Sequence, residues 1–188
     1  MIITREKALE LFHEYIDSES LIKHSLAVEG AMRGCATKFV ESVEVWGACG
    51  LLHDIDFQRW PDNHLEKVPD ILRQAGYPED FIEAILGHGD FTQVPRKTPM
   101  AKCLYAVDQM ASFIIAVALM RPTKLEGMSV KSVKKKMKDK AFAKAVSREE
   151  MQKGADELEM DISQLIEIVI HSLQVREKEL ENMDLSLM

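Results

Sequence analysis

Residues 51–56 read Leu51-Leu52-His53-Asp54-Ile55-Asp56 and set a histidine beside an aspartate behind an apolar run. They lie at the end of a helix predicted for residues 42–54, on which Trp46, Cys49 and His53 share an inward face because of their helical spacing. Adjacent His and Asp can reach one centre where a helix ends, because their side chains can converge there. Imidazole and carboxylate ligands suit Mn, Fe, Zn, Co and Ni, and carboxylate also suits Mg. We therefore predict a metal site on a helical scaffold.

Three further groups lie on the inward faces of predicted helices. His24 shares its face with Cys35, Asp108 lies in the middle of an apolar helix, and His88 ends another helix. A buried carboxylate is costly unless it is paired or bound to a metal. Taken singly, each histidine is better explained as a hydrogen-bonded core residue. Taken with the adjacent His-Asp pair, the set favours one shared site.

The remaining pattern predicts a single all-α domain over residues 1–188. Glycine (9) and proline (6) are scarce and aromatic residues make up 6%, which favours helices over a β-sandwich. We expect the last third of the chain to pack onto the first two-thirds, with loops at residues 56–63 and 89–99. Thr4, a Ser147/Glu150 capping box and Asp161 are the predicted helix starts. The predicted helices cover residues 5–15, 20–39, 42–54, 64–74, 78–88, 100–120, 129–138, a segment opening at Ser147, and 161–181.

The bulk composition narrows the functional classes. The net charge of −7 argues against binding of a nucleic acid polymer, which requires a surplus of Lys and Arg. No signal peptide is predicted, and the longest apolar stretch, residues 111–120, is too short to span a membrane. Three cysteines without CxxC spacing are interpreted as reduced core residues, which favours a cytoplasmic location: Cys35, Cys49 and Cys103.

The order His … His-Asp … Asp resembles the HD-domain superfamily, an all-helical group of metal-dependent phosphohydrolases. Residues 51–56 look like the central motif of that family, although many members of its HDIG branch have Gly where this chain has Asp56. The resemblance covers about residues 18–115, followed by a helical extension of about residues 123–184. The chain looks like small, predicted HD hydrolases of bacteria and archaea whose substrates are unassigned. The resemblance implies a helical HD-domain bundle.

The same resemblance implies a ligand set of two parts. His24, His53, Asp54 and Asp108 would be the core ligands, with Asp54 also the catalytic residue. In two-metal members the order is His, His-Asp, His, His, Asp, which adds His64 and His88 and makes Asp54 a bridging ligand. The family often has His-Pro-x-x-Gly where this chain has residues 64–68, so a solvated helix-cap histidine is the alternative for His64. The implied cofactor is two divalent ions of Mn, Fe, Co, Ni, Zn or Mg.

Cationic side chains near the motif are candidates for binding substrate phosphate. Lys67 lies one turn after His64, and Arg96 and Lys97 lie in the loop after His88. Asp56 could accept a proton, although an N-cap or loop role is the preferred interpretation. Four lysines form a stripe on one face of a predicted helix: Lys131, Lys134, Lys135 and Lys138. The preferred interpretation is a solvated face. The functional alternatives are an anion-binding wall over the metal site and a docking surface.

The leading functional prediction is a metal-dependent phosphohydrolase that acts on a small phosphorylated molecule, such as a nucleotide or phosphomonoester, through a metal-activated water. One alternative is an HD-type di-iron oxygenase, which uses the same six-ligand order. Another is a non-catalytic regulatory module that binds a nucleotide. The expected partner is the small phosphorylated molecule, with neither nucleic acid nor membrane, and the sequence makes no prediction of oligomeric state.

Overall fold

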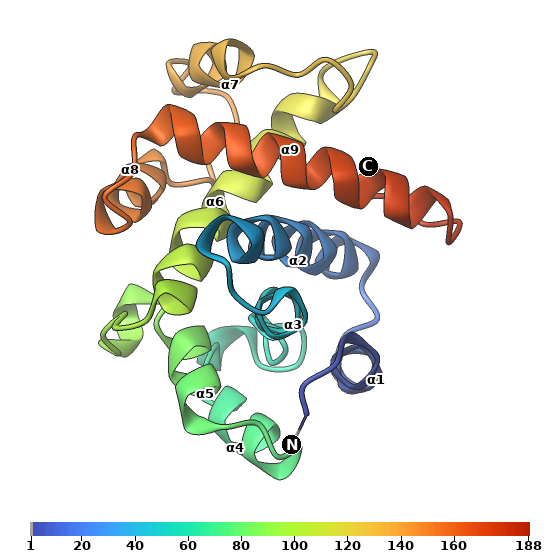
Figure 1. The fold of residues 1–188 in the computed structure, drawn as a ribbon, viewed down its shortest axis with the longest axis vertical. Coiled ribbons are helices and arrows are strands. Elements are labelled where there is room, and N and C mark those ends of the chain that lie inside the picture. Colours follow the sequence, from blue (N-terminus) through green and yellow to red (C-terminus); the bar gives the residue numbers. More distant parts are fainter. Residues whose placement is uncertain (1) are drawn as a thin grey trace.

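The computed structural model describes residues 2–188, and in that range the chain is all-α, as predicted (Figure 1). No strand occurs among the described residues. Two short 3-10 helices, Pro61–Asn63 and Asp90–Thr92, lie in the predicted loops. The α-helices are α1 (Arg5–Tyr15), α2 (Glu19–Phe39), α3 (Val43–Leu52), α4 (Val68–Gln74), α5 (Glu79–Leu86), α6 (Pro99–Leu119), α7 (Val130–Met137), α8 (Arg148–Glu157) and α9 (Ile162–Glu181).

Local chemistry explains most of the helix starts. The side chains of Thr4, Ser147 and Asp161 each accept a backbone N–H from the first turn of the following helix, which confirms the three predicted caps. The predicted start of a helix at His64 is wrong, because α4 begins at Val68. Residues 64–67 form a turn instead, since the His64 ring and the Lys67 N–H are both bonded to Asp56.

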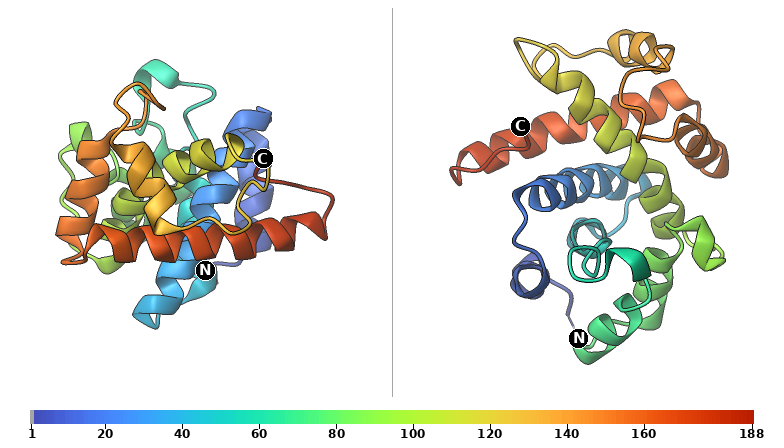
Figure 2. Two further views of the ribbon diagram at one scale, coloured as in Figure 1. Left: turned by 90° about the horizontal axis from the view of Figure 1, so that it is seen from above. Right: turned by 180° about the vertical axis from the view of Figure 1, so that it is seen from behind.

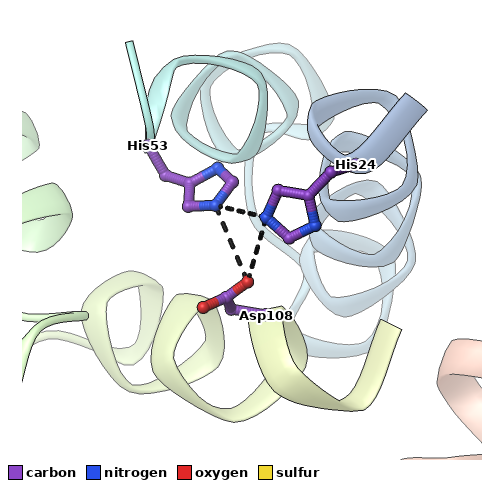
Figure 3. Close-up of side chains that lie close together, drawn as sticks. All are labelled: His24, His53 and Asp108. Carbon is purple, nitrogen blue, oxygen red and sulfur yellow. Dashed lines mark hydrogen bonds and ion pairs between the residues drawn. The ribbon is translucent and has the colours of Figure 1, made fainter. Parts of the chain in front are cut away.

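Helix α2 is the central element of the packing. It lies between α3 on one side and α9 on the other, and α6 crosses it (Figures 1 and 2). Residues 25–32 of α2 are buried throughout. A Cβ atom at Gly34 would fall 1.7 Å from Ser172 Oγ, so a glycine is needed for α9 to approach this closely. The first turns of α2, the end of α3 and the middle of α6 meet around a cluster of polar side chains (Figure 3).

Helix α6 combines length with apolar character. Its 21 residues are long and apolar enough to cross a membrane by length and composition alone. The helix is therefore longer than the apolar stretch of residues 111–120, from which the sequence predicted that no segment could span a membrane. Of its most apolar 18-residue window, 61% is buried inside the protein. Its neighbours are α2, α5, α8 and α9, so its apolar surface is used in packing.

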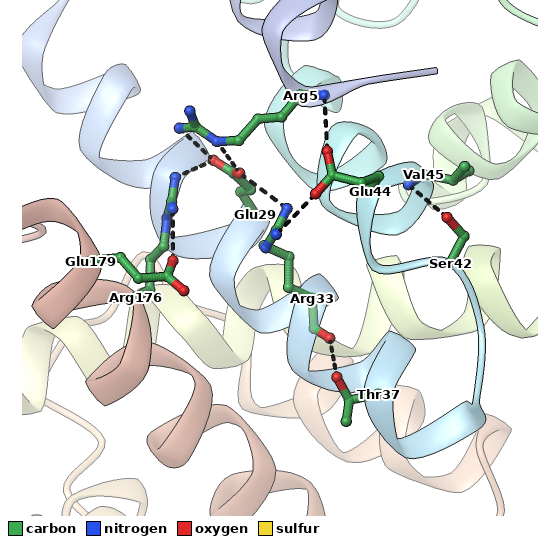
Figure 4. Close-up of polar contacts among 9 residues, drawn as sticks. All are labelled: Arg5, Glu29, Arg33, Thr37, Ser42, Glu44, Val45, Arg176 and Glu179. Carbon is green, nitrogen blue, oxygen red and sulfur yellow. Dashed lines mark hydrogen bonds and ion pairs between the residues drawn. The ribbon is translucent and has the colours of Figure 1, made fainter. Parts of the chain in front are cut away.

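A buried ionic network joins the two ends of the chain (Figure 4). The Glu29 side chain on α2 is fully buried and accepts hydrogen bonds from Arg176 Nη2 at 2.6 Å and Arg5 Nε at 2.7 Å. Arg176 lies on α9 and its side chain is only 3% exposed. A buried charge of this kind is tolerated only because it is paired. The network therefore ties α1 and α9 to α2.

We predict that Glu29→Ala lowers the free energy of unfolding by about 3–5 kcal/mol, because it leaves the Arg176 guanidinium buried without its main carboxylate. Urea unfolding followed by circular dichroism measures this loss. Glu44→Ala is the matched control, since Glu44 pairs with Arg33 at an exposed position and should contribute only about 0–1 kcal/mol. The double variant Glu29→Met/Arg176→Met should recover much of the loss. Equal effects of the Glu29 and Glu44 substitutions would contradict the prediction.

Candidate metal centre

The six predicted metal ligands lie together, although they come from five separate segments. His24 is on α2 and Asp108 on α6, and the ring of one and the carboxylate of the other face His53 at the end of α3 (Figure 3). His64 and His88 lie in the turns before α4 and after α5. The histidine Nε2 atoms all face carboxylate oxygens in one cluster, formed by His24, His53, Asp54, His64, His88 and Asp108.

Backbone carbonyls orient two of the imidazole rings. His53 Nδ1 is 2.8 Å from the Gly50 oxygen, and His88 Nδ1 is 2.6 Å from the Ile85 oxygen. A carbonyl oxygen can only accept, so the proton of each neutral ring must be on Nδ1. Each Nε2 atom then carries a lone pair that is directed into the cluster, which is the form in which imidazole binds a metal.

Side chains orient the other two rings. His24 Nδ1 lies 3.1 Å from Ser112 Oγ, and His64 Nδ1 lies 2.9 Å from Asp56 Oδ1. Asp56 is fully buried, and its second oxygen accepts the backbone N–H of Lys67 at 3.2 Å. Asp56 therefore fixes the orientation of His64 and caps the turn that leads into α4. Asp56 is the N-cap of neither neighbouring helix, so of the two preferred interpretations the loop role is confirmed. No periodic pattern in the sequence indicated the Asp56–His64 pair.

The two carboxylate oxygens of Asp54 face different pairs of histidines. Asp54 Oδ2 is 3.5 Å from His24 Nε2 and 3.3 Å from His53 Nε2. Asp54 Oδ1 is 3.3 Å from the Nε2 atoms of both His64 and His88. We call His24, His53, Asp108 and Asp54 Oδ2 the first half-site, and His64, His88 and Asp54 Oδ1 the second half-site.

The donor atoms fit a divalent metal ion. His24 Nε2 and His53 Nε2 are 3.0 Å apart, and Asp108 Oδ1 lies 3.2 Å and 3.7 Å from them. Bonds of about 2.1 Å to a tetrahedral ion would separate its ligands by about 3.4 Å, close to these distances. The lone pairs of the two Nε2 atoms would repel each other at this distance, and the carboxylates of Asp54 and Asp108 lie beside them. A cation between these atoms offsets both repulsions. The chemistry of the set therefore matches a metal site.

Without a metal, protons would take the place of the cation. Burial lowers the pKa of His24, but the hydrogen bonds from Asp108 and Asp54 outweigh it and raise that pKa to about 9. Burial also lowers the pKa of His64, but its contacts with Asp54 and Asp56 outweigh burial and raise that pKa to about 9. The pKa of His53 is likewise well above its usual range. Burial tends to raise the pKa of Asp108, yet His24 and His53 hold it well below its ordinary value. Metal binding must therefore displace protons.

The cluster opens into a cavity of about 510 Å³, which we call the metal-site cavity. Neither Lys nor Arg is among its described lining residues. Its charged members outside the ligand set are the carboxylates of Asp90 and Glu150. The sequence predicted Glu150 only as part of a capping box with Ser147, and Ser147 Oγ does accept the Glu150 N–H. Only the packing of α8 against α6 brings its side chain to the cavity.

The three predicted phosphate-binding cations lie elsewhere. Lys67 and Lys97 are exposed and are absent from the cavity lining. Arg96 is nearly buried, binds both oxygens of Glu157 at 2.6 and 2.7 Å, and also bonds Asp90 and the Gly87 carbonyl. Its guanidinium therefore fastens the loop that carries His88 onto α8. The contacts of Arg96 in this structure are therefore structural, and a substrate contact for Lys67, Arg96 or Lys97 stays a prediction.

The lysine stripe of α7 does not form a wall over the site. None of Lys131, Lys134, Lys135 and Lys138 lines the metal-site cavity. Helix α7 packs against α9 and α6, and Lys134 Nζ donates to Ser163 Oγ on α9 at 2.9 Å. The other two interpretations, a solvated face and a docking surface, stay open.

Fold and site together define an all-helical protein with a histidine–aspartate cluster suited to divalent metal ions. Residues 21–112 match the model of the family described as the HD domain. This part of the chain is an HD domain, and the predicted membership of the HD-domain superfamily is confirmed. The match contains all six clustered residues, whereas the HDIG branch stays a prediction. No curated protein and no solved structure matched the chain.

We predict that Asp56→Ala lowers the metal affinity of the second half-site about 10–100-fold, because His64 loses the carboxylate that orients its ring. Elemental analysis and calorimetric titration with Mn²⁺ should show a stoichiometry reduced in the same way as by His64→Ala. Asp62→Ala removes an exposed carboxylate nearby and is the control. If Asp56→Ala kept full metal content while His64→Ala lost it, the positioning role of Asp56 would be wrong.

We also predict that the thermal stability of metal-free protein depends on pH in a way that metal loading removes. The folded-state pKa values of His24 and His64 are about 9, against a usual value near 6.5, so protonation of these rings stabilises the folded state. This contribution is complete below about pH 6.5 and is lost as the pH rises toward about 9. With a chelator present, the Tm should fall between pH 6.5 and 9.5. With Mn²⁺ present the fall should be absent, and a flat metal-free profile would contradict the assignment.

Proposed function

We propose that this protein is a metal-dependent phosphohydrolase that acts on a small phosphorylated molecule, such as a nucleotide or a phosphomonoester. The observation that carries the proposal is the division of the Asp54 carboxylate between two pairs of histidines. This arrangement suits two divalent ions held side by side, which is a common arrangement in phosphoryl-transfer sites. HD domains bind divalent metals and are commonly phosphohydrolases, which agrees with the match over residues 21–112.

The roles of the chain's own residues follow from their positions. Bound divalent ions would supply an activated water and would offset negative charge on the phosphoryl group. Asp54 would hold both ions, with His24, His53 and Asp108 completing the first half-site. Ser112 and Asp56 keep His24 and His64 in their orientations through their Nδ1 atoms. The protein thereby holds the metal-binding side chains in place before substrate binds. Groups fixed in advance stabilise the charge that develops in the transition state.

The metal-site cavity supports a small substrate rather than a polymer. Its volume of about 510 Å³ falls within the usual range for small-molecule sites, about 300–1,000 Å³. The described lining contains no Lys or Arg, and the nearby cations Lys153 and Arg96 are paired with Asp90, so the ions would meet most of the negative charge of a phosphate. Removal of the metal should therefore abolish substrate binding as well as turnover. Such a dependence on metal is what we expect of a phosphohydrolase whose catalytic groups are the ions and the side chains that bind them.

We predict that Asp54→Ala abolishes metal binding and phosphate release while the helical circular dichroism stays largely intact. Asp54 is the only carboxylate within reach of both half-sites among the described residues, so no neighbour can replace it. Asp156→Ala, which removes an exposed carboxylate on α8, is the matched control. Phosphate release from a panel of nucleotides and phosphomonoesters is measured with Mn, Fe, Mg or Ni in excess. Unchanged turnover in the Asp54 variant would end the proposal.

The same samples separate the alternatives. A mixed-valent di-iron signal in electron paramagnetic resonance, with oxygen consumption and no phosphate release, would establish an oxygenase instead. Nucleotide binding without any phosphate release across the panel would favour a regulatory module. Phosphate release that requires the metal and Asp54 supports the hydrolase.

A further inference from the structure

Two exposed phenylalanines lie at the border between the metal-site cavity and a second cavity. Phe57 is 38% exposed and Phe91 is 66% exposed. The second cavity, which we call the outer cavity, measures about 670 Å³. Phe57, Phe91 and His64 line both cavities, so the two adjoin at these three side chains. The His64 ring lies 5.1 Å from the Phe57 ring and 6.1 Å from the Phe91 ring, so the aromatic pair borders the second half-site.

The Phe91 ring is held in place although its surface is exposed. A Cβ atom at Gly89 would lie 2.8 Å from Phe91 Cε1 and 2.7 Å from Leu65 Cδ1, so the ring rests directly against the backbone of Gly89. A ring held in this way offers its free face to a ligand at little conformational cost. Exposed aromatic surface beside a polar site is otherwise unfavourable, and such surface commonly marks a binding position.

The charges of the outer cavity limit what can lie there. Its described lining holds Asp62 and Glu66 and contains neither Lys nor Arg. Apolar side chains, among them Leu65, Leu86 and Val94, form much of the rest. A second anionic group would meet carboxylates with no cation to offset them. An uncharged, planar group would instead find two aromatic faces and an apolar wall.

We propose that the outer cavity, with Phe57 and Phe91, is the subsite for the leaving group of the substrate, and that this group is planar and uncharged. The proposal rests on the proposed function, because it places the phosphoryl group at the metal half-sites. The position of the two cavities on either side of the same three side chains carries the geometry, and the absence of Lys and Arg from the lining of the outer cavity carries the chemical class. A phosphoester with an aromatic or heteroaromatic leaving group fits both conditions.

Binding of two non-hydrolysable phosphonates to the Mn²⁺-loaded protein tests the subsite without any turnover. Benzylphosphonate and cyclohexylmethylphosphonate share the phosphonate and the ring size but differ in planarity. Calorimetry should show that wild-type protein binds the benzyl compound about 3- to 10-fold more tightly, as expected for a ring–ring contact. A benzylphosphonate with a 4-carboxylate should bind at least about 10-fold more weakly than the parent compound, because it brings a like charge to Asp62 and Glu66.

Variants identify the residues responsible. Phe57→Leu and Phe91→Leu should each reduce the preference for the planar ring, and together they should bring it near to one. Phe57→Tyr and Phe91→Tyr retain an aromatic face and should keep the preference. Met120→Leu is the matched control, since Met120 is 67% exposed and lines neither cavity. Metal content and circular dichroism check that each variant is folded and loaded.

The outcomes separate the subsite from the proposed function. The subsite is overturned if wild-type protein shows no preference for the planar phosphonate, or if the two leucine substitutions leave the preference unchanged. If the preference depends on Phe57 and Phe91 but no phosphoester is hydrolysed, the subsite stands and the phosphohydrolase proposal fails. If phosphoesters are hydrolysed but the protein shows no preference for the planar ring, the phosphohydrolase proposal stands and the subsite fails.

Discussion

The rest of the site depends on the carboxylate of Asp54, which four imidazole Nε2 atoms approach to within 3.3–3.5 Å. A carboxylate at this depth is stable only where positive charge surrounds it. Protons on the histidines or divalent metal ions can supply that charge, and the lone pairs on the Nε2 atoms favour the ions. Five segments must therefore meet at one place: the start of α2, the end of α3, the turns before α4 and after α5, and the middle of α6.

Contacts outside the cluster make that arrangement rigid. Each of the four site histidines is held at Nδ1 by a carbonyl, a hydroxyl or a carboxylate, and these partner groups come from different segments of the chain. Helices beyond the matched HD region take part as well. Arg96 fastens the His88 loop to Glu157 on α8, and Arg176 on α9 pairs with Glu29 on α2. The C-terminal helices thus stabilise the same elements that carry the ligands, rather than forming a separate unit.

The electrostatic character of the cavities is as informative as their ligands. Carboxylates and histidines line the metal-site cavity, and the outer cavity adds Asp62 and Glu66 without a compensating Lys or Arg. An anionic substrate would be attracted mainly through bound metal, so the ions would serve both recognition and chemistry. The aromatic rings of Phe57 and Phe91 then offer contacts that do not depend on charge. Metal recognition at one end and aromatic recognition at the other would together limit the substrate.

The sequence by itself determined the all-helical fold and the inward positions of His24, His53, His88 and Asp108, with Asp54 beside His53, because helical periodicity fixes which side chains point inward. The motif order added His64, and the division of the set into two metal positions, through resemblance to a known family. Only the tertiary structure decided the pairing of Asp56 with His64, the structural role of Arg96, and the arrival of Glu150 at the cavity. These contacts join turns and helices far apart in the chain, where no periodic pattern operates. Their partners are set by how α8 packs on α6 and by how the turns around His64 and His88 close, and both depend on the folded core as a whole.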